Sequence, residues 1–196
     1  LDKEELHDKA ALIMHTEPKD PHGQDLEHII DHLDLKDRQV MLSTQKVTPE
    51  NLSELYNMVD CTINISDAEG FGLATLESLS CGTPIIATMT GGLQEQITNG
   101  DEEFGIGLLP RSKSIIGSQQ VPYIYEDRVD KAQFHSALSK IYKMGKEGRR
   151  DLGTLGRKHV VENYNFNNLQ TKWVEVIDKI VKEKETYNGI RFKEVA

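Results

Sequence analysis

Apolar residues gather in five short runs within the first 110 residues of the chain. Each run is five or six residues long and almost continuously hydrophobic, which is typical of strands that are covered on both faces in a parallel sheet. The strands predicted in this way cover residues 10–15, 39–43, 61–66, 84–88 and 105–109.

Amphipathic segments separate these runs. Residues 25–35 carry an apolar stripe at helical spacing, Thr48 and Pro49 form a helix start, and residues 73–79 open a further helix directly after a glycine pair. Alternation of strand and helix requires right-handed crossovers. The pattern therefore predicts an α/β fold with a doubly wound, mostly parallel, Rossmann-like sheet.

The pattern changes after residue 110. Residues 111–128 contain Gly117 and Pro122 and are predicted to form a long loop. Residues 129–185 are helical in pattern and form a C-terminal extension of the same domain.

Composition narrows the function classes. The net charge is −9, which argues against a nucleic-acid partner because such proteins need a concentrated basic surface. No apolar run approaches the ~20 residues of a membrane span, and Leu1 does not open a signal peptide. The two cysteines provide neither a disulfide framework nor a CxxC metal pair. These features predict a cytoplasmic protein.

The loop after the third predicted strand has the most informative chemistry. Gly70 and Gly72 allow a ligand to approach the backbone, and the helix that follows directs free N–H groups at it, as anion sites do. Glu69 and Glu77 add carboxylates, which suit a ligand with hydroxyls as well as phosphates, such as a nucleotide sugar. The spacing alone also allows plain turn glycines, a capping charge at Glu69 and a solvated Glu77.

A longer set of motifs resembles one family. Glu69 and Glu77 are separated by seven residues, and with the segments around them they resemble the signature of retaining, nucleotide-sugar-dependent glycosyltransferases of the two-Rossmann-domain (GT-B) architecture, group 1 type. The segments that carry the resemblance are 66–77, 77–87, 91–95, 152–157 and 164–173.

The resemblance implies roles for individual residues. Glu69 would be the catalytic residue beside the transferred sugar, and Glu77 would accept hydrogen bonds from the ribose. Donor binding would fall to Gly70, Phe71, Gly72, Leu73, Glu77 and Gly92. The implied reaction transfers a hexose from a nucleoside diphosphate sugar to a sugar or glycolipid acceptor, with no cofactor and no essential metal. A nucleotide-sugar epimerase, a phosphorylase on the same fold, and a non-catalytic nucleotide-sugar-binding module remain alternatives.

Two departures from the family pattern lead to further expectations. No strand with the family's Arg and Lys precedes residue 10, where residues 1–9 are charged and helical in pattern, so the central first strand of the sheet is expected to be missing. The N-terminal acceptor domain is also absent from residues 1–196, which correspond to the donor-binding domain. We therefore expect this fragment to be inactive on its own.

Overall fold

The computed structural model describes residues 9–21, 23–35 and 38–186, and it divides into two compact units, residues 1–50 and 51–196. We call these the N-terminal unit and the C-terminal unit. The segments 1–8 and 187–196 lie outside the described residues, so the expected helical pattern before Lys9 is not addressed by the structure.

The N-terminal unit contains one parallel strand pair and one helix. Its elements are β1 (Leu12–His15), α1 (Leu26–His32) and β2 (Val40–Ser43). The register runs from Leu12 opposite Val40 to His15 opposite Ser43. Helix α1 begins after Asp25, whose side chain accepts a hydrogen bond from the backbone N–H of His28 at 3.0 Å. Both predicted strands and the predicted helix are confirmed, each somewhat shorter than its pattern.

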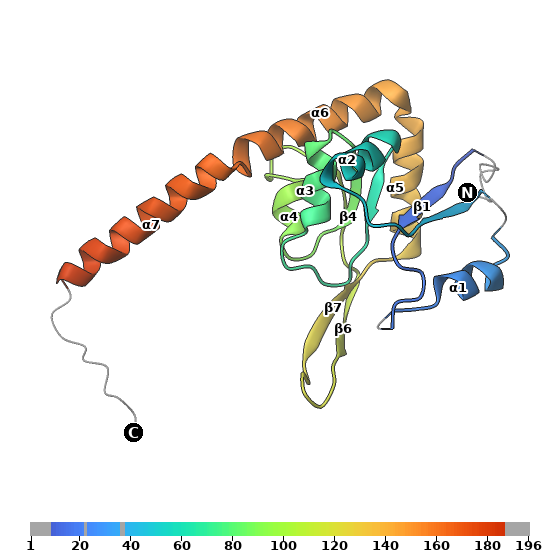
Figure 1. The fold of residues 1–196 in the computed structure, drawn as a ribbon, viewed down its shortest axis with the longest axis horizontal. Helices are drawn as coiled ribbons and strands as arrows, with labels where there is room; N and C mark the ends of the chain where they lie inside the picture. The colour runs from blue at the N-terminus through green and yellow to red at the C-terminus, as the bar shows by residue number, and fades with distance from the viewer. Residues whose placement is uncertain (1–8, 22, 36–37, 187–196) are drawn as a thin grey trace. The chain divides into compact units, whose positions relative to one another are not determined.

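The C-terminal unit is built on a three-stranded parallel sheet (Figure 1). The sheet has the order β3 (Thr62–Asn64), β4 (Ile85–Thr88) and β5 (Ile106–Leu108), with β4 in the centre. The helices of this unit are α2 (Pro49–Met58), α3 (Leu73–Ser80), α4 (Leu93–Ile97), α5 (Lys131–Lys143), α6 (Gly145–Asn163) and α7 (Phe166–Thr186). All four residues of β4 are buried, as the continuous apolar run predicted.

Alternate residues of β4 belong to separate cores on the two faces of this sheet. Ile85 and Ala87 pack with residues of α3, α4 and α6, whereas Ile86 packs with Ile106, Leu108 and residues of α5. Period-two alternation in a strand directs neighbouring side chains to opposite faces, so both faces are covered by helices. The chain therefore has the mixed α/β, doubly wound, Rossmann-like fold that the sequence predicted.

Close contact between α3 and α6 depends on glycines. A Cβ atom on Gly153 would lie 1.8 Å from the carbonyl oxygen of Gly82, and one on Gly156 would lie 2.6 Å from the Leu79 side chain. Since real Cβ atoms do not approach so closely, these positions keep the helix against the end of α3.

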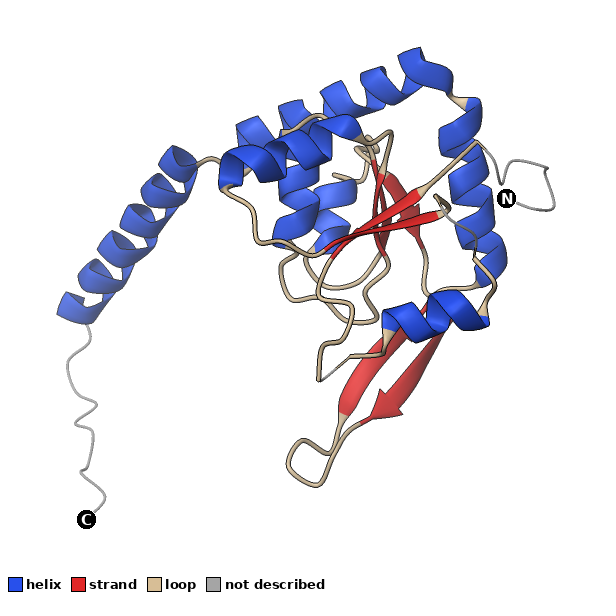
Figure 2. Ribbon diagram, turned by 45° about the vertical axis from the view of Figure 1, so that its right-hand side comes forward, coloured by secondary structure: helices blue, strands red, loops and turns tan. Residues whose placement is uncertain are grey.

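The prediction of a long loop over residues 111–128 is wrong. This segment forms an antiparallel hairpin of β6 (Ser112–Ile116) and β7 (Ile124–Arg128), which projects from the C-terminal unit (Figures 1 and 2). Gly117 and Pro122 lie in the connection between the strands, not within them. β-branched and aromatic residues on either side of that connection favour the extended backbone.

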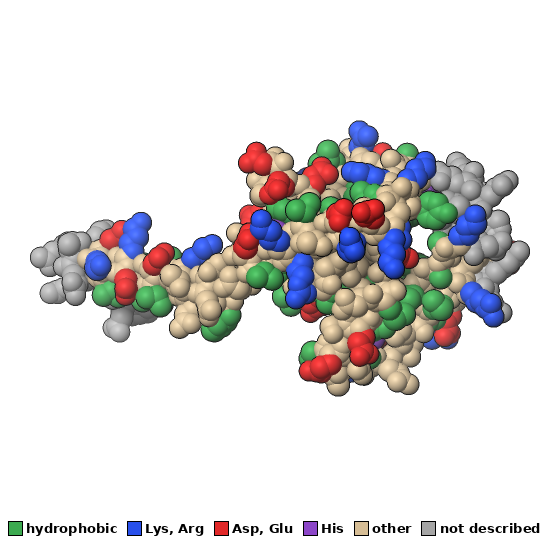
Figure 3. All heavy atoms as spheres, turned by 90° about the horizontal axis from the view of Figure 1, so that it is seen from above, with side chains coloured by type: hydrophobic (Ala, Val, Ile, Leu, Met, Phe, Trp, Pro, Cys, Tyr) green, Lys and Arg blue, Asp and Glu red, His purple; other side chains and the backbone are tan. Residues whose placement is uncertain are grey.

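The five predicted parallel strands fall into two separately hydrogen-bonded sets, β1–β2 and β3–β4–β5. The expected absence of a central first strand, and of an acceptor domain, stays a prediction. None of the described helices is both long and apolar enough to cross a membrane. On the face shown in Figure 3, acidic and basic side chains are interspersed.

Candidate functional site

The loop that carries the candidate site begins at Asn64, the last residue of β3. The Asn64 side-chain oxygen accepts hydrogen bonds from the backbone N–H of Ser66 at 3.2 Å and from its hydroxyl at 2.7 Å. Its amide nitrogen donates to the hydroxyl of Thr75 at 3.2 Å, and Thr75 is fully buried in α3. Asn64 therefore ties the start of the loop to the helix that ends it, a role that the sequence pattern did not reveal.

Two glycine-containing loops meet through their backbones. The N–H of Gly92 donates to the carbonyl oxygen of Gly70 at 3.1 Å. A Cβ atom on Gly92 would lie 2.7 Å from the carbonyl oxygen of Phe71, and one on Gly91 would lie 1.7 Å from that of Glu69. Only glycine fits at these positions without movement of the opposite backbone. The structure thus brings together three of the predicted donor-binding residues, Gly70, Phe71 and Gly92.

Gly72 begins α3 in a left-handed conformation, with φ of 89°. A Cβ atom there would lie 2.3 Å from the side chain of Leu93, so a larger residue has neither the backbone conformation nor the space. No side chain caps this helix start. Since the first N–H groups of a helix lack partners within it, they remain available to an anion.

A tyrosine holds the second glutamate. The phenol of Tyr56 in α2 donates a hydrogen bond to Oε2 of Glu77 at 2.9 Å. Partial burial, together with the hydrogen bond to this carboxylate, raises the pKa of Tyr56 well above its ordinary value. Tyr56 therefore remains a neutral donor at physiological pH. Glu77 itself is exposed on α3, where a ligand can reach its carboxylate.

Glu69 lies before α3 in the chain, and Glu77 lies on the second turn of this helix. Glu69 is partly buried. Phe71 is half exposed and meets the ring of Tyr164 edge-on, with centroids 6.3 Å apart. Leu73 is 67% exposed, so of its groups only the backbone is suited to bind a polar donor.

The hairpin also reaches this loop. The backbone N–H of Asp127 donates to the carbonyl oxygen of Asp67 at 2.7 Å. The guanidinium of Arg128 lies between the carboxylates of Asp67 and Glu126 and pairs with both. The loop that carries Glu69 is therefore anchored to the base of the hairpin. The sequence pattern does not indicate these contacts, because it predicts a loop over residues 111–128.

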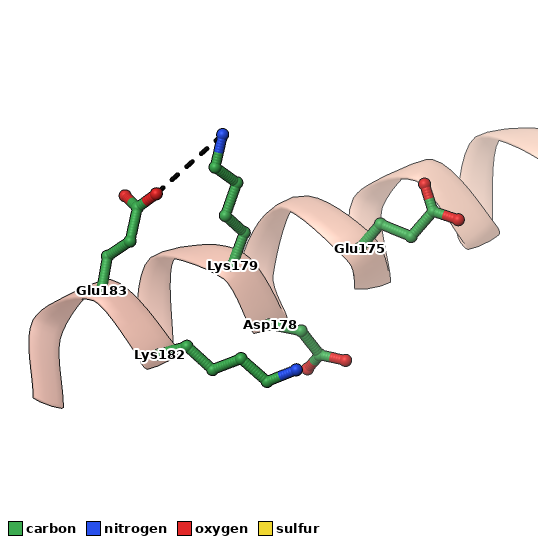
Figure 4. A pocket seen from close by; sticks show the side chains of 5 residues that line it. All are labelled: Glu175, Asp178, Lys179, Lys182 and Glu183. Carbon is green, nitrogen blue, oxygen red and sulfur yellow. Dashed lines mark ion pairs between the residues drawn. The ribbon is translucent and has the colours of Figure 1, made fainter.

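Two other kinds of site, a metal centre and a surface hollow, can be assessed on the described part of the chain. Within residues 9–186, apart from the gaps at 22 and 36–37, no group of three or more His, Cys, Asp or Glu side chains is arranged to hold a metal ion. A hollow on α7 is lined by charged residues of this one helix, with an ion pair of 3.9 Å between Lys179 and Glu183 (Figure 4). A single helix supplies no opposite wall, so this hollow cannot enclose a ligand.

Comparisons with known proteins agree with the fold and motifs. Residues 3–159 match the family described as Glycosyl transferases group 1. The chain is 38% identical over 73 residues to N-acetyl-alpha-D-glucosaminyl L-malate synthase of Bacillus anthracis, a match that covers 37% of this chain and 18% of that enzyme. The chain thus matches less than a fifth of the length of this curated relative.

Solved structures share the fold at low identity. A glycosyltransferase of Rickettsia africae superimposes with a TM-score of 0.67 at 19% identity, over 91% of this chain and 42% of that one. HepE of Anabaena, solved in complex with UDP-glucose, gives a TM-score of 0.61 at 15% identity, over 86% of this chain and 41% of that one. With the family matched over most of the chain, this protein belongs to the group 1 glycosyltransferases of GT-B architecture.

Proposed function

We propose that the chain binds the donor in a retaining glycosyltransferase that transfers a hexose from a nucleoside diphosphate sugar to a sugar or glycolipid acceptor in the cytoplasm. The observation that carries this proposal is the start of α3. It has no side-chain cap, it is set by Gly72, and a carboxylate held by Tyr56 lies one turn further along the helix. A nucleotide sugar presents both a diphosphate for the N–H groups and vicinal hydroxyls for a carboxylate acceptor.

Different residues of the site would bind the diphosphate, the ribose and the transferred sugar of the donor. The first N–H groups of α3 would bind the diphosphate, since the partial positive charge at a helix N-terminus favours an anion. Glu77 would accept from the vicinal hydroxyls of the ribose, with Tyr56 fixing the orientation of its carboxylate. Glu69 would face the transferred sugar, and the Gly91–Gly92 loop would close beside it. The fold shared with HepE, which was solved with UDP-glucose, supports this type of donor.

The reaction needs the leaving diphosphate to be stabilised as its charge develops. Oriented backbone N–H groups can supply part of this stabilisation without a metal ion. We therefore propose that no divalent metal is essential, and we expect activity to persist in excess EDTA. We also propose that a separate acceptor domain binds the acceptor and completes the catalytic site.

A thermal-shift panel of UDP-, GDP- and ADP-sugars tests donor binding. A ligand present at 100 times its Kd stabilises the folded state by roughly 2.7 kcal/mol. For a protein of this size, we expect a rise in Tm of about 5–11 °C with the correct nucleotide. No shift with any nucleotide sugar would contradict the proposal.

Product analysis with the full-length protein separates the alternatives. Retention at the anomeric carbon, followed by NMR of the product, supports the proposed transfer. Inversion at C2 of the donor would indicate an epimerase, sugar phosphate formation from phosphate would indicate a phosphorylase, and binding without turnover would indicate a binding module.

A further inference from the structure

The β6–β7 hairpin has an unusual distribution of charge along its length. Its base carries charged residues at 111, 113 and 126–128, whereas residues 114–125 contain no charged side chain. We call residues 114–125 the hairpin tip. In a chain with net charge −9 and 28% charged residues, a projecting element of twelve uncharged residues points to an apolar environment around the tip.

The apolar side chains of the tip occupy both faces of the ribbon. Ile115 lies opposite Tyr125, and Ile116 lies opposite Ile124 at the next step of the ladder. Neighbouring positions of a strand point to opposite faces, so one pair lies on each side. The hairpin is therefore charged at its base and uncharged in its tip, where apolar side chains lie on both faces and residues 118–120 of the connection are polar but uncharged.

These side chains are exposed. Ile115 and Tyr125 are each 61% exposed, Tyr123 is 75% exposed and Val121 is 53% exposed. Ile116 and Ile124, on the other face, are also exposed. The flat surface of another protein covers one face of a two-stranded ribbon, whereas a fluid apolar medium covers both.

We propose that the hairpin tip enters the interfacial region of a phospholipid bilayer. Each residue of an antiparallel strand adds about 3.4 Å to the length of the hairpin. Two paired positions and the connecting residues therefore extend over a length comparable to the roughly 5–10 Å to which interfacial elements are buried in a bilayer. Tyr123 and Tyr125 suit this depth, because tyrosine combines an apolar ring with a hydroxyl that stays hydrated. An uncharged tip on an acidic chain favours a zwitterionic bilayer over an anionic one.

The base of the hairpin connects this surface to the candidate site. The hydrogen bond from Asp127 to Asp67 and the ion pair of Arg128 with Asp67 fix the hairpin to the loop that carries Glu69. A tip held in the bilayer would keep that loop close to the membrane surface. This consequence rests on the proposed function, and it selects a membrane-embedded glycolipid as the acceptor.

Sedimentation with phosphatidylcholine vesicles tests the membrane contact itself, without any need for activity. Two double variants each replace the apolar pair on one face of the hairpin by serine. One variant combines Ile115→Ser with Tyr125→Ser, and the other combines Ile116→Ser with Ile124→Ser. We expect each variant to lower the vesicle partition coefficient of the full-length protein at least tenfold. Binding by the unchanged protein should vary little between 50 and 500 mM salt, because an uncharged tip makes few screened interactions.

The matched control removes apolar side chains of similar exposure from α7, Trp173→Ser with Ile177→Ser, and should leave the partition coefficient unchanged. Three results would overturn the proposal. They are loss of binding with only one of the two face variants, which indicates contact through a single face, equal loss with the α7 variant, and no sedimentation of the unchanged protein.

A second measurement does not depend on the folding of the serine variants. An environment-sensitive fluorophore on Gln119→Cys, at the end of the hairpin, should shift to shorter wavelength when phosphatidylcholine vesicles are added. The same fluorophore on Lys158→Cys, exposed on α6, should not shift. An unshifted spectrum at position 119 contradicts insertion even if the protein sediments. Vesicle binding with no nucleotide-sugar binding would leave this proposal standing and remove the proposed function.

Discussion

Substitution of Gly92 by alanine tests the contact between the two glycine loops. The added methyl group would lie 2.7 Å from the carbonyl oxygen of Phe71 and 2.9 Å from that of Gly70, both of them backbone atoms that cannot rotate away. The φ of Gly92 is −66°, so alanine meets no conformational penalty and the effect is purely steric. Overpacking costs about 1–3 kcal/mol, and loss of the Gly92–Gly70 hydrogen bond adds about 0.5–1.5 kcal/mol.

Part of this cost is offset, because alanine restricts the unfolded chain by about 0.4–1 kcal/mol relative to glycine. We therefore expect Gly92→Ala to lower the free energy of unfolding by about 0.5–4 kcal/mol and the Tm by roughly 1–16 °C. Gly70→Ala is the matched control in the same contact. A Cβ atom on Gly70 would meet nothing within 4 Å, so its Tm should stay the same or rise slightly.

Differential scanning calorimetry of both variants checks this expectation. Equal Tm values for Gly92→Ala and the unchanged protein would refute the backbone contact. A large loss for Gly70→Ala would show that the two loops are arranged differently.

The remaining predictions concern single side chains. Tyr56→Phe removes the donor to Glu77 and should weaken binding of the nucleoside diphosphate about two- to tenfold by calorimetry, whereas Tyr142→Phe on α5 should not. This effect is smaller than that of a buried hydrogen bond to a charged group because the pair is partly exposed. Glu69→Gln in the full-length protein should lower kcat far more than it weakens binding of the nucleoside diphosphate, because the sugar gains charge only in the transition state; a raised KM with an unchanged kcat would make Glu69 a binding residue alone. Burial raises the pKa of the Cys61 thiol to about 12, so a disulfide reagent at pH 8 should modify it far more slowly in the native protein than in urea. Since the unfolded thiol ionises near its ordinary pKa, stability should fall as the pH rises from about 9 toward 12.

The sequence predicted where the five parallel strands lie, but the expected cover on both faces is wrong for β1, β2 and β3, none of which has a buried residue. Residues 85–88 form a continuous apolar run, and that run became the buried central strand β4. Helix α4, Leu93–Ile97, was missed because five residues are too few to show a helical period. The hairpin is hidden in the sequence because Gly117 and Pro122 interrupt the apolar pattern of residues 111–128, although they lie only in the connection between its strands.

The candidate site could be predicted only as far as its residues are neighbours in the chain. The glycines around residue 70 and the two glutamates form one segment, so their motif is visible in the sequence. The contact between Tyr56 and Glu77 joins residues 21 apart, and the pair of Asp67 with Arg128 joins residues 61 apart. Such contacts depend on how the helices and the hairpin are placed, and neither residue of such a pair signals its partner.

Calorimetry of UDP, GDP and ADP binding to the unchanged protein and to Glu77→Ala tests whether the Glu77 carboxylate binds the donor nucleotide. The account predicts that one nucleoside diphosphate binds and that Glu77→Ala weakens its affinity by about tenfold to a hundredfold, which is the effect of removing a charged hydrogen-bond acceptor worth about 1.5–3 kcal/mol. Unchanged affinity in Glu77→Ala would contradict the claim that this carboxylate, at the start of α3, binds the donor nucleotide.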